Sequence, residues 1–169
     1  MGYQIPTEAE MTIAKVNQAK KQVFGWANIA NAWKRVAVDG FELAPVIDWQ
    51  GGIMEIEALE NSAYAYVTNS RQSGEEHLDY RTGEDFKSVG YAIESMVFTR
   101  EKQTALGIPA GIIPEGWWVG FQITNDAVWS KIVAGKYTGF SIQGRVNYTE
   151  DEIPTSELGN YDLPGKEDN

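Results

Sequence analysis

At residues 139–148 the chain reads GFSIQGRVNY, and this stretch decides the fold that we predict. Apolar and polar side chains alternate along it with a period of two, as in a strand with one buried face. One face carries Phe140, Ile142, Val146 and Tyr148. The polar face carries Ser141, and the glycines at 139 and 144 leave little bulk around it, so another backbone could approach its hydroxyl closely.

A serine hydroxyl is a weak nucleophile unless a base accepts its proton. The chain contains a single histidine, His77, which lies in a polar segment at residues 70–88. Histidine suits the role of general base because its pKa lies near neutrality. Most serines in strands and most histidines in loops are structural, but Ser141 and His77 together predict a serine protease.

The composition narrows the class of protein. The 169 residues suit one domain, or one domain with a tail, and the absence of cysteine excludes disulfides and thiolate metal sites. The chain shows no secretory signal and no run of about 18 apolar residues. The formal net charge is −10, so no basic face is expected and direct binding of nucleic acid is not predicted. We expect no metal and no cofactor.

The order of the expected elements indicates an α+β fold. An Asp-Gly pair at residues 39–40 predicts a hairpin, and Thr99 and Asn125 are expected to cap helices. Strands are predicted at 22–30, 33–38, 41–46, 89–98, 117–123 and 139–148, and helices at 55–69, 100–106 and 126–134. We expect mainly antiparallel pairing, closing into a barrel with a few short surrounding helices.

The chain is expected to divide into a protease domain at residues 1–148 and a C-terminal tail at residues 149–169. The tail contains seven acidic residues and one lysine, which gives it a charge of −6 and leaves −4 for the rest. Prolines and glycines lie among these acids, so the tail is predicted to be disordered or loosely attached.

Six short segments recur together, and in the same order, in a known family. They are VFGWA at 23–27, DWQGGI at 48–53, NSR at 69–71 leading to His77, ESMVFT at 94–99, GWWVGF at 116–121 and FSIQG at 140–144. Through these segments, residues 12 to 148 resemble the XkdF-like phage serine proteases, relatives of the prohead (capsid maturation) proteases.

The resemblance implies a fold like that of the herpesvirus assemblins, an antiparallel β-barrel surrounded by helices. It also implies an endopeptidase that works inside the phage prohead, in the host cytoplasm. Its substrates would be the phage scaffold and major capsid proteins and, often, the enzyme itself. Such an enzyme needs no cofactor, contacts neither nucleic acid nor membrane directly, and could form a homo-oligomer.

The resemblance also assigns roles to residues. Ser141 is the nucleophile, His77 is the general base, and Glu94 occupies the strand that matches the third member of the catalytic group. Asp79 and Glu76 are alternatives for that third role because they lie beside His77 in the chain. Proximity in sequence alone makes Gly144 and Arg145, together with Gln143, candidates for the oxyanion hole.

Two classes of protein without enzymatic activity remain as alternatives. The first is a capsid-assembly or structural protein that retains the protease fold without its activity. The second is a β-rich binding module that uses exposed tryptophans, of which the chain has six.

Overall fold

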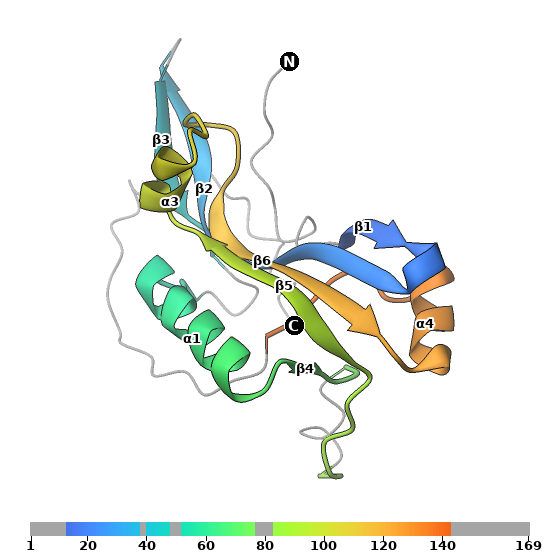
Figure 1. Cartoon of the computed structure of the whole chain (residues 1–169). Helices are drawn as coiled ribbons and strands as arrows, with labels where there is room; N and C mark the ends of the chain where they lie inside the picture. The colour runs from blue at the N-terminus through green and yellow to red at the C-terminus, as the bar shows by residue number, and fades with distance from the viewer. Residues whose placement is uncertain (1–12, 38–39, 48–51, 77–82, 143–169) are drawn as a thin grey trace, which may run out of the picture.

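The computed structural model describes residues 13–37, 40–47, 52–76 and 83–142 (Figure 1). Six strands, three α-helices and one short 3-10 helix lie in this part of the chain. In order they are β1 (Ile13–Asn17), η2 (Gln18–Lys20), β2 (Gln22–Ala37), β3 (Gly40–Pro45), α1 (Ile56–Asn69), β4 (Gln72–Ser73), β5 (Gly90–Phe98), α3 (Arg100–Ala105), β6 (Glu115–Ile123) and α4 (Asp126–Val133).

The strands form one antiparallel sheet, which confirms the α+β class. The strand order is β1-β2-β6-β5-β4, and β3 pairs with the second half of β2. Within the described residues the sheet is open, with β1 at one end of this path and β4 at the other. The closed barrel predicted from the sequence is therefore not observed.

Local sequence signals set most of these elements. The predicted hairpin is confirmed, since β2 and β3 pair antiparallel up to Ala37 and Gly40, although Gly40 is already part of β3 and the two strands expected before the turn are one 16-residue strand. Thr99 caps α3 by accepting a hydrogen bond from the Lys102 amide. Asn125 caps α4 in the same way, and α4 ends before Gly135, which has a φ of 70°.

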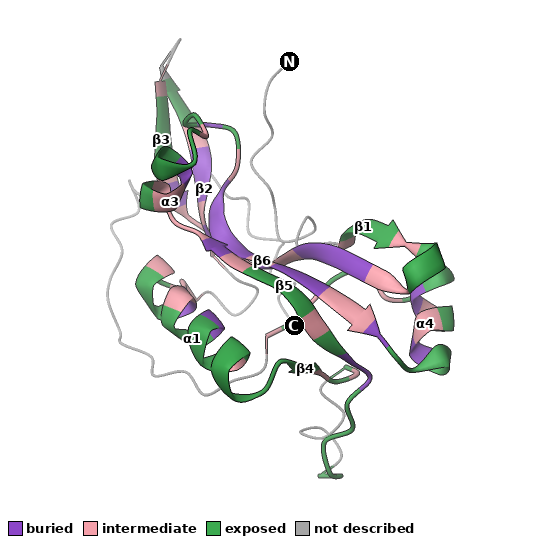
Figure 2. Cartoon of the chain, viewed as in Figure 1, coloured by how far each residue is buried: buried purple, intermediate pink, exposed green. Residues whose placement is uncertain are grey.

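One face of the sheet packs against both long helices and carries the core. At the α1 end, Leu59 of α1 packs into a cluster with residues of β2, β5 and β6, including Trp117. At the α4 end, Val128 and Ile132 of α4 join Val23 and Ile123 of the sheet. Figure 2 shows the buried residues concentrated along β2 and β6, the two central strands. We call this the helix-covered face.

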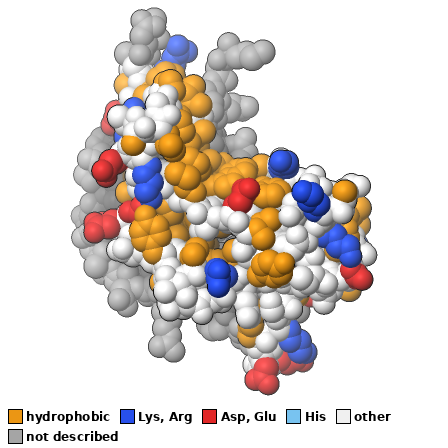
Figure 3. Space-filling model, viewed as in Figure 1, with side chains coloured by type: hydrophobic (Ala, Val, Ile, Leu, Met, Phe, Trp, Pro, Cys, Tyr) orange, Lys and Arg blue, Asp and Glu red, His pale blue; other side chains and the backbone are white. Residues whose placement is uncertain are grey.

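The opposite face of the sheet carries aromatic side chains. Trp26 packs edge-on against Phe98 and Trp118, with ring centroids 5.9 and 5.5 Å apart. Hydrophobic side chains gather from the β2–β3 hairpin to the centre of the sheet in Figure 3. We call this the aromatic face. It also holds Glu94, because Glu94 pairs across the sheet with Gly120, whose missing Cβ would point towards Glu94 and Phe24.

Candidate active site

The segment that contains Ser141 lies along the helix-covered face. The Ile13 amide donates a hydrogen bond of 2.7 Å to the Thr138 carbonyl, so the segment starts beside β1. It then packs towards the middle of the sheet, where the Phe140 ring lies 5.4 Å from that of Phe121 and Ile142 contacts the α1 cluster. The Ser141 segment thus joins the two ends of the core.

The strand predicted at 139–148 is not observed in its described part. Gly139 forms a single bridge, and residues 140–142 have no regular secondary structure. Packing of Phe140 and Ile142 onto the sheet replaces pairing at its edge. The predicted alternation is nevertheless confirmed for three residues, because Phe140 and Ile142 are partly buried and Ser141 between them is exposed. The Ser141 side chain is therefore accessible to solvent.

His77 lies outside the described residues, but the chain immediately before it is held in place. The Glu75 Oε1 atom is 2.5 Å from the Lys131 ammonium of α4 and 2.5 Å from the Tyr137 hydroxyl. Lys131 and Tyr137 are themselves 3.2 Å apart. The Glu75 side chain is 18% exposed. These three residues form a closed set of contacts, which we call the Glu75 cluster.

The electrostatics of the Glu75 cluster favour its charged form. Hydrogen bonds from Lys131, and then from Tyr137, hold the pKa of the Glu75 carboxyl below its usual range. The same carboxylate, and then the Tyr137 hydroxyl, raise the pKa of the Lys131 ammonium. Partial burial and hydrogen bonding with Glu75 raise the pKa of Tyr137. The ion pair is therefore fully formed at neutral pH.

The Glu75 cluster joins the two segments that contain the predicted catalytic pair. Glu75 precedes His77 by two residues, and Tyr137 precedes Ser141 by four. An extended chain spans at most about 3.6 Å per residue, which gives roughly 7 Å for the first connection and roughly 14 Å for the second. These upper limits are compatible with a contact between Ser141 and His77, which itself lies outside the described residues.

Glu94 is placed differently from what the sequence suggested. Glu94 lies on β5, as expected, but its side chain is exposed, and the indole N–H of Trp118 lies 3.4 Å from its carboxylate. A register shift between Ala92 and Glu94 directs Glu94 to the aromatic face. Phe140 and Ile142 pack on the other face of the sheet. The structure thus does not bring Glu94 and Ser141 together.

The remaining candidates lie mostly beyond the described part of the chain. This holds for the oxyanion-hole candidates Gly144 and Arg145 and for Asp79, so their roles stay predictions. Glu76 is exposed, has a left-handed backbone with a φ of 49°, and hydrogen-bonds with Tyr137. Of the acids beside His77, Glu76 is thus the one that the structure places next to the Glu75 cluster.

Sequence reasoning did not find the Glu75 cluster, and no local signal could have shown it. Glu75 is separated from Lys131 by 56 positions and from Tyr137 by 62. Glu75 is one of five acids between residues 70 and 88, and nothing in their spacing distinguishes it. Packing of α4 against the sheet brings these side chains together.

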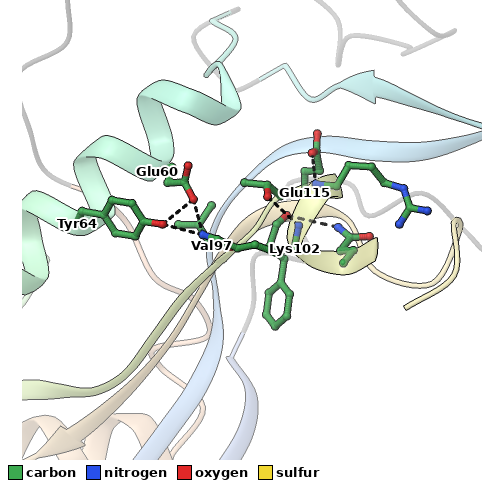
Figure 4. A network of polar contacts seen from close by, with 9 residues as sticks. Glu60, Tyr64, Val97, Lys102 and Glu115 are labelled. Atoms are coloured by element: carbon green, nitrogen blue, oxygen red, sulfur yellow. Dashed lines mark hydrogen bonds and ion pairs between the residues drawn. The ribbon is translucent and has the colours of Figure 1, made fainter. Parts of the chain in front are cut away.

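A second polar network joins α1, α3 and β5. The Lys102 ammonium of α3 contacts the Glu60 carboxylate and, at 2.8 Å, the Tyr64 hydroxyl, both from α1 (Figure 4). It also donates a hydrogen bond of 3.1 Å to the Val97 carbonyl of β5. Partial burial opposes the charge of Lys102, but the hydrogen bonds with Glu60 and Tyr64 outweigh it and raise the Lys102 pKa. This network fixes α1 and α3 relative to β5.

The residues that the structure describes offer neither a metal site nor a membrane-spanning helix. They contain no group of three histidine, cysteine, aspartate or glutamate side chains arranged to hold a metal ion. None of their helices has the length and apolar character needed to cross a membrane.

The family profile described as "Putative phage serine protease XkdF" matches residues 28–150. The chain belongs to this family. The matched region includes His77, Glu94 and Ser141, and also the three residues of the Glu75 cluster. Family membership agrees with the resemblance seen in the six short segments.

Two relatives from Bacillus subtilis (strain 168) are similar to the chain. The protein YqbD is 28% identical over 112 residues, which are 66% of this chain and 32% of YqbD. The phage-like element PBSX protein XkdF is 28% identical over 118 residues, or 70% of this chain and 39% of that protein. The chain thus spans well under half the length of these relatives. No solved structure matches, so the assemblin-like fold stays a prediction.

The lowered pKa of Glu75 gives a test of the Glu75 cluster by pH. Because the pKa is lower in the folded state than in the unfolded one, the ion pair stabilises the fold above the unfolded value, about 4.3, and this contribution is lost as the pH falls below it. We expect Glu75→Gln to lower the urea midpoint of unfolding at pH 7. The difference in midpoint between the wild type and the variant should disappear as the pH falls towards 3.

A matched control for this measurement lies at the other end of α4. Asp126 pairs with Lys21 at 2.5 Å, but its side chain is 83% exposed, so Asp126→Asn should change the midpoint little at any pH. A deficit of Glu75→Gln that is equal at pH 7 and pH 3 would show that lost packing, and not the ion pair, is responsible.

Proposed function

We propose that this chain is a phage prohead serine endopeptidase in which Ser141 is the nucleophile and His77 is the general base. Its substrates are the phage scaffold and major capsid proteins, and its own chain, cleaved inside the prohead in the host cytoplasm. The family description supports the activity. The observation that carries the assignment to these two residues is the Glu75 cluster, which links the segment before His77 to the segment before Ser141.

The proposed reaction needs only groups of this chain and water. His77 accepts the Ser141 hydroxyl proton as the oxygen attacks the scissile carbonyl carbon, forming a tetrahedral intermediate. Protonated His77 then gives this proton to the leaving amine, and the peptide C–N bond breaks to leave an acyl-enzyme. A water molecule, deprotonated by His77, hydrolyses the ester and restores Ser141. Exposure of Ser141 matches a polypeptide substrate that must reach it from solvent.

Covalent labelling tests the proposal directly. We expect a fluorophosphonate probe to modify Ser141, identified by mass spectrometry of the digested protein, because only a serine activated by a base reacts rapidly. His77→Ala should slow labelling by at least a hundredfold, the lower range of general-base contributions.

The chain also offers a control serine. Ser130 is exposed on α4, where its hydroxyl donates to the Asp126 carbonyl, so Ser130→Ala should leave labelling unchanged. An unlabelled Ser141, or labelling that is equally fast without His77, would contradict the proposed function. The chain would then fit the alternative of an assembly protein that retains the fold without catalysis.

A further inference from the structure

Among the described strands, the outer edge of β5 has no partner along a short stretch next to α1. β4 pairs with residues 90–91 of β5 only, and the Ala92 amide donates to the Arg71 carbonyl. From Ile93 to Phe98, none of the strands that the structure describes pairs with this edge. Open edges of this kind are the sites at which extended segments add to a sheet.

Two features limit this open stretch. The register shift between Ala92 and Glu94 interrupts the ladder at one end. At the other end, the Val97 carbonyl accepts a hydrogen bond from Lys102 and therefore points away from β6 (Figure 4). Because backbone groups alternate in direction along an antiparallel strand, the N–H and C=O of Ser95 also point outward. The open stretch is thus centred on Ser95, with the Val97 N–H beside it.

A hollow lies beside this edge on the helix-covered face. Its walls are Ala63, Tyr64, Val67 and Thr68 of α1 and Ser95 and Val97 of β5. The Ser95 hydroxyl is held by a hydrogen bond of 2.9 Å from the Trp117 indole N–H. Three of the six lining residues have aliphatic side chains, and the other three have hydroxyl groups. The hollow therefore fits an apolar side chain of moderate size.

The hollow and the Ser141 segment border the same core cluster. Ala63 and Val97 belong to the same cluster on which Ile142 packs, and Ile142 directly follows Ser141. An apolar side chain bound in the hollow would therefore extend the cluster on which the Ser141 segment packs.

The charge next to the hollow indicates the neighbouring residues of the bound segment. Glu94 precedes Ser95 and is exposed on the aromatic face. In an added strand, the residue opposite Ser95 points towards the hollow, and the residue opposite Glu94 points to the aromatic face. A lysine or arginine opposite Glu94 would complement its charge, as the charge of −10 on the whole chain also favours.

We propose that the β5 edge binds an extended substrate segment by strand addition, with an apolar side chain in the hollow and a basic side chain opposite Glu94. The identification of this segment as substrate rests on the proposed function, but its binding does not require catalysis. Glu94 acquires a role in recognition that agrees with its place on the aromatic face.

Hydrogen exchange of the full chain carrying Ser141→Ala tests the proposal without cleavage. The probe is a nine-residue peptide with Lys-Val-Lys at its centre between glycine and serine residues, blocked at both ends. We expect it to slow exchange of the Ser95 and Val97 amides at least tenfold. The same peptide with N-methylated valine, which cannot complete the pairing, should have no effect, and neither should a Glu-Val-Glu peptide.

Charge reversal provides a matched pair of variants. Glu94→Lys should reverse the preference, so that Glu-Val-Glu protects Ser95 and Lys-Val-Lys does not. Glu42→Lys makes the same change at an exposed position of β3 and should retain the original preference. A preference unchanged by Glu94→Lys, or peptide binding without protection of Ser95, would overturn the proposal.

The free protein distinguishes the other possible occupants. Slow exchange at Ser95 without peptide would mean that another part of this chain already pairs with β5. Protection that increases with protein concentration would mean that a second copy does so. Either result overturns the proposal, and neither bears on whether Ser141 is the nucleophile, which the labelling experiment decides separately.

Discussion

Replacing Ser141 with alanine is expected to reduce cleavage of a co-expressed scaffold–capsid substrate by about a thousandfold or more. In the proposed reaction the Ser141 hydroxyl supplies the oxygen of the acyl-enzyme, and alanine has no group that could replace it. Enzymes that lose a member of such a catalytic set typically retain only the small part of their activity that comes from binding and oxyanion stabilisation.

The fold should be unaffected by this change. Ser141 is exposed, and the flanking residues Phe140 and Ile142, which pack on the sheet, are retained. Thermal denaturation of Ser141→Ala should therefore match that of the wild type to within about 0.5 kcal/mol, the usual range for surface substitutions. Undiminished cleavage by a folded Ser141→Ala protein would remove Ser141 from the mechanism.

His77→Ala and the double variant complete this argument. Ser141 and His77 are proposed to act as one unit, so the losses of cleavage activity caused by the two substitutions should not add. The double variant should be about as inactive as either single variant. Losses that multiply would instead indicate two independent roles, and cleavage assays on the three variants distinguish these cases.

The local parts of the fold could be predicted from the sequence because local signals determine them. The hairpin of β2 and β3 and the caps at Thr99 and Asn125 each depend on a few neighbouring residues. The alternation around Ser141 likewise places its side chain correctly as exposed, even though the segment is not a strand.

The parts that could not be predicted depend on register and on contacts between distant residues. One irregular position before Glu94 reverses the face on which its side chain lies, and strict alternation cannot reveal such a shift. Lys102 contacts Glu60 across 42 positions, and the Glu75 cluster spans more. Candidate residues can therefore be named from the sequence, whereas their partners follow only from the packing of α1, α3 and α4.

Replacing Leu59 with alanine is expected to cause the largest loss of stability of any single truncation in α1. Leu59 is completely buried, and it packs between α1 and the sheet in the cluster that includes Val97, Val119 and Trp117. Truncating a buried leucine removes its burial free energy and leaves a cavity, which together cost about 2–5 kcal/mol. For a domain of this size, such a loss lowers Tm by roughly 5–15 °C.

The same substitution at an exposed leucine isolates the effect of burial. Leu106 is 57% exposed after α3, so Leu106→Ala should cost less than about 0.5 kcal/mol in urea denaturation. Equal losses at the two positions would show that α1 does not contribute to the core as described. Because α1 also provides four walls of the hollow beside β5, Leu59→Ala should in addition weaken binding of the Lys-Val-Lys peptide, whereas Leu106→Ala should not.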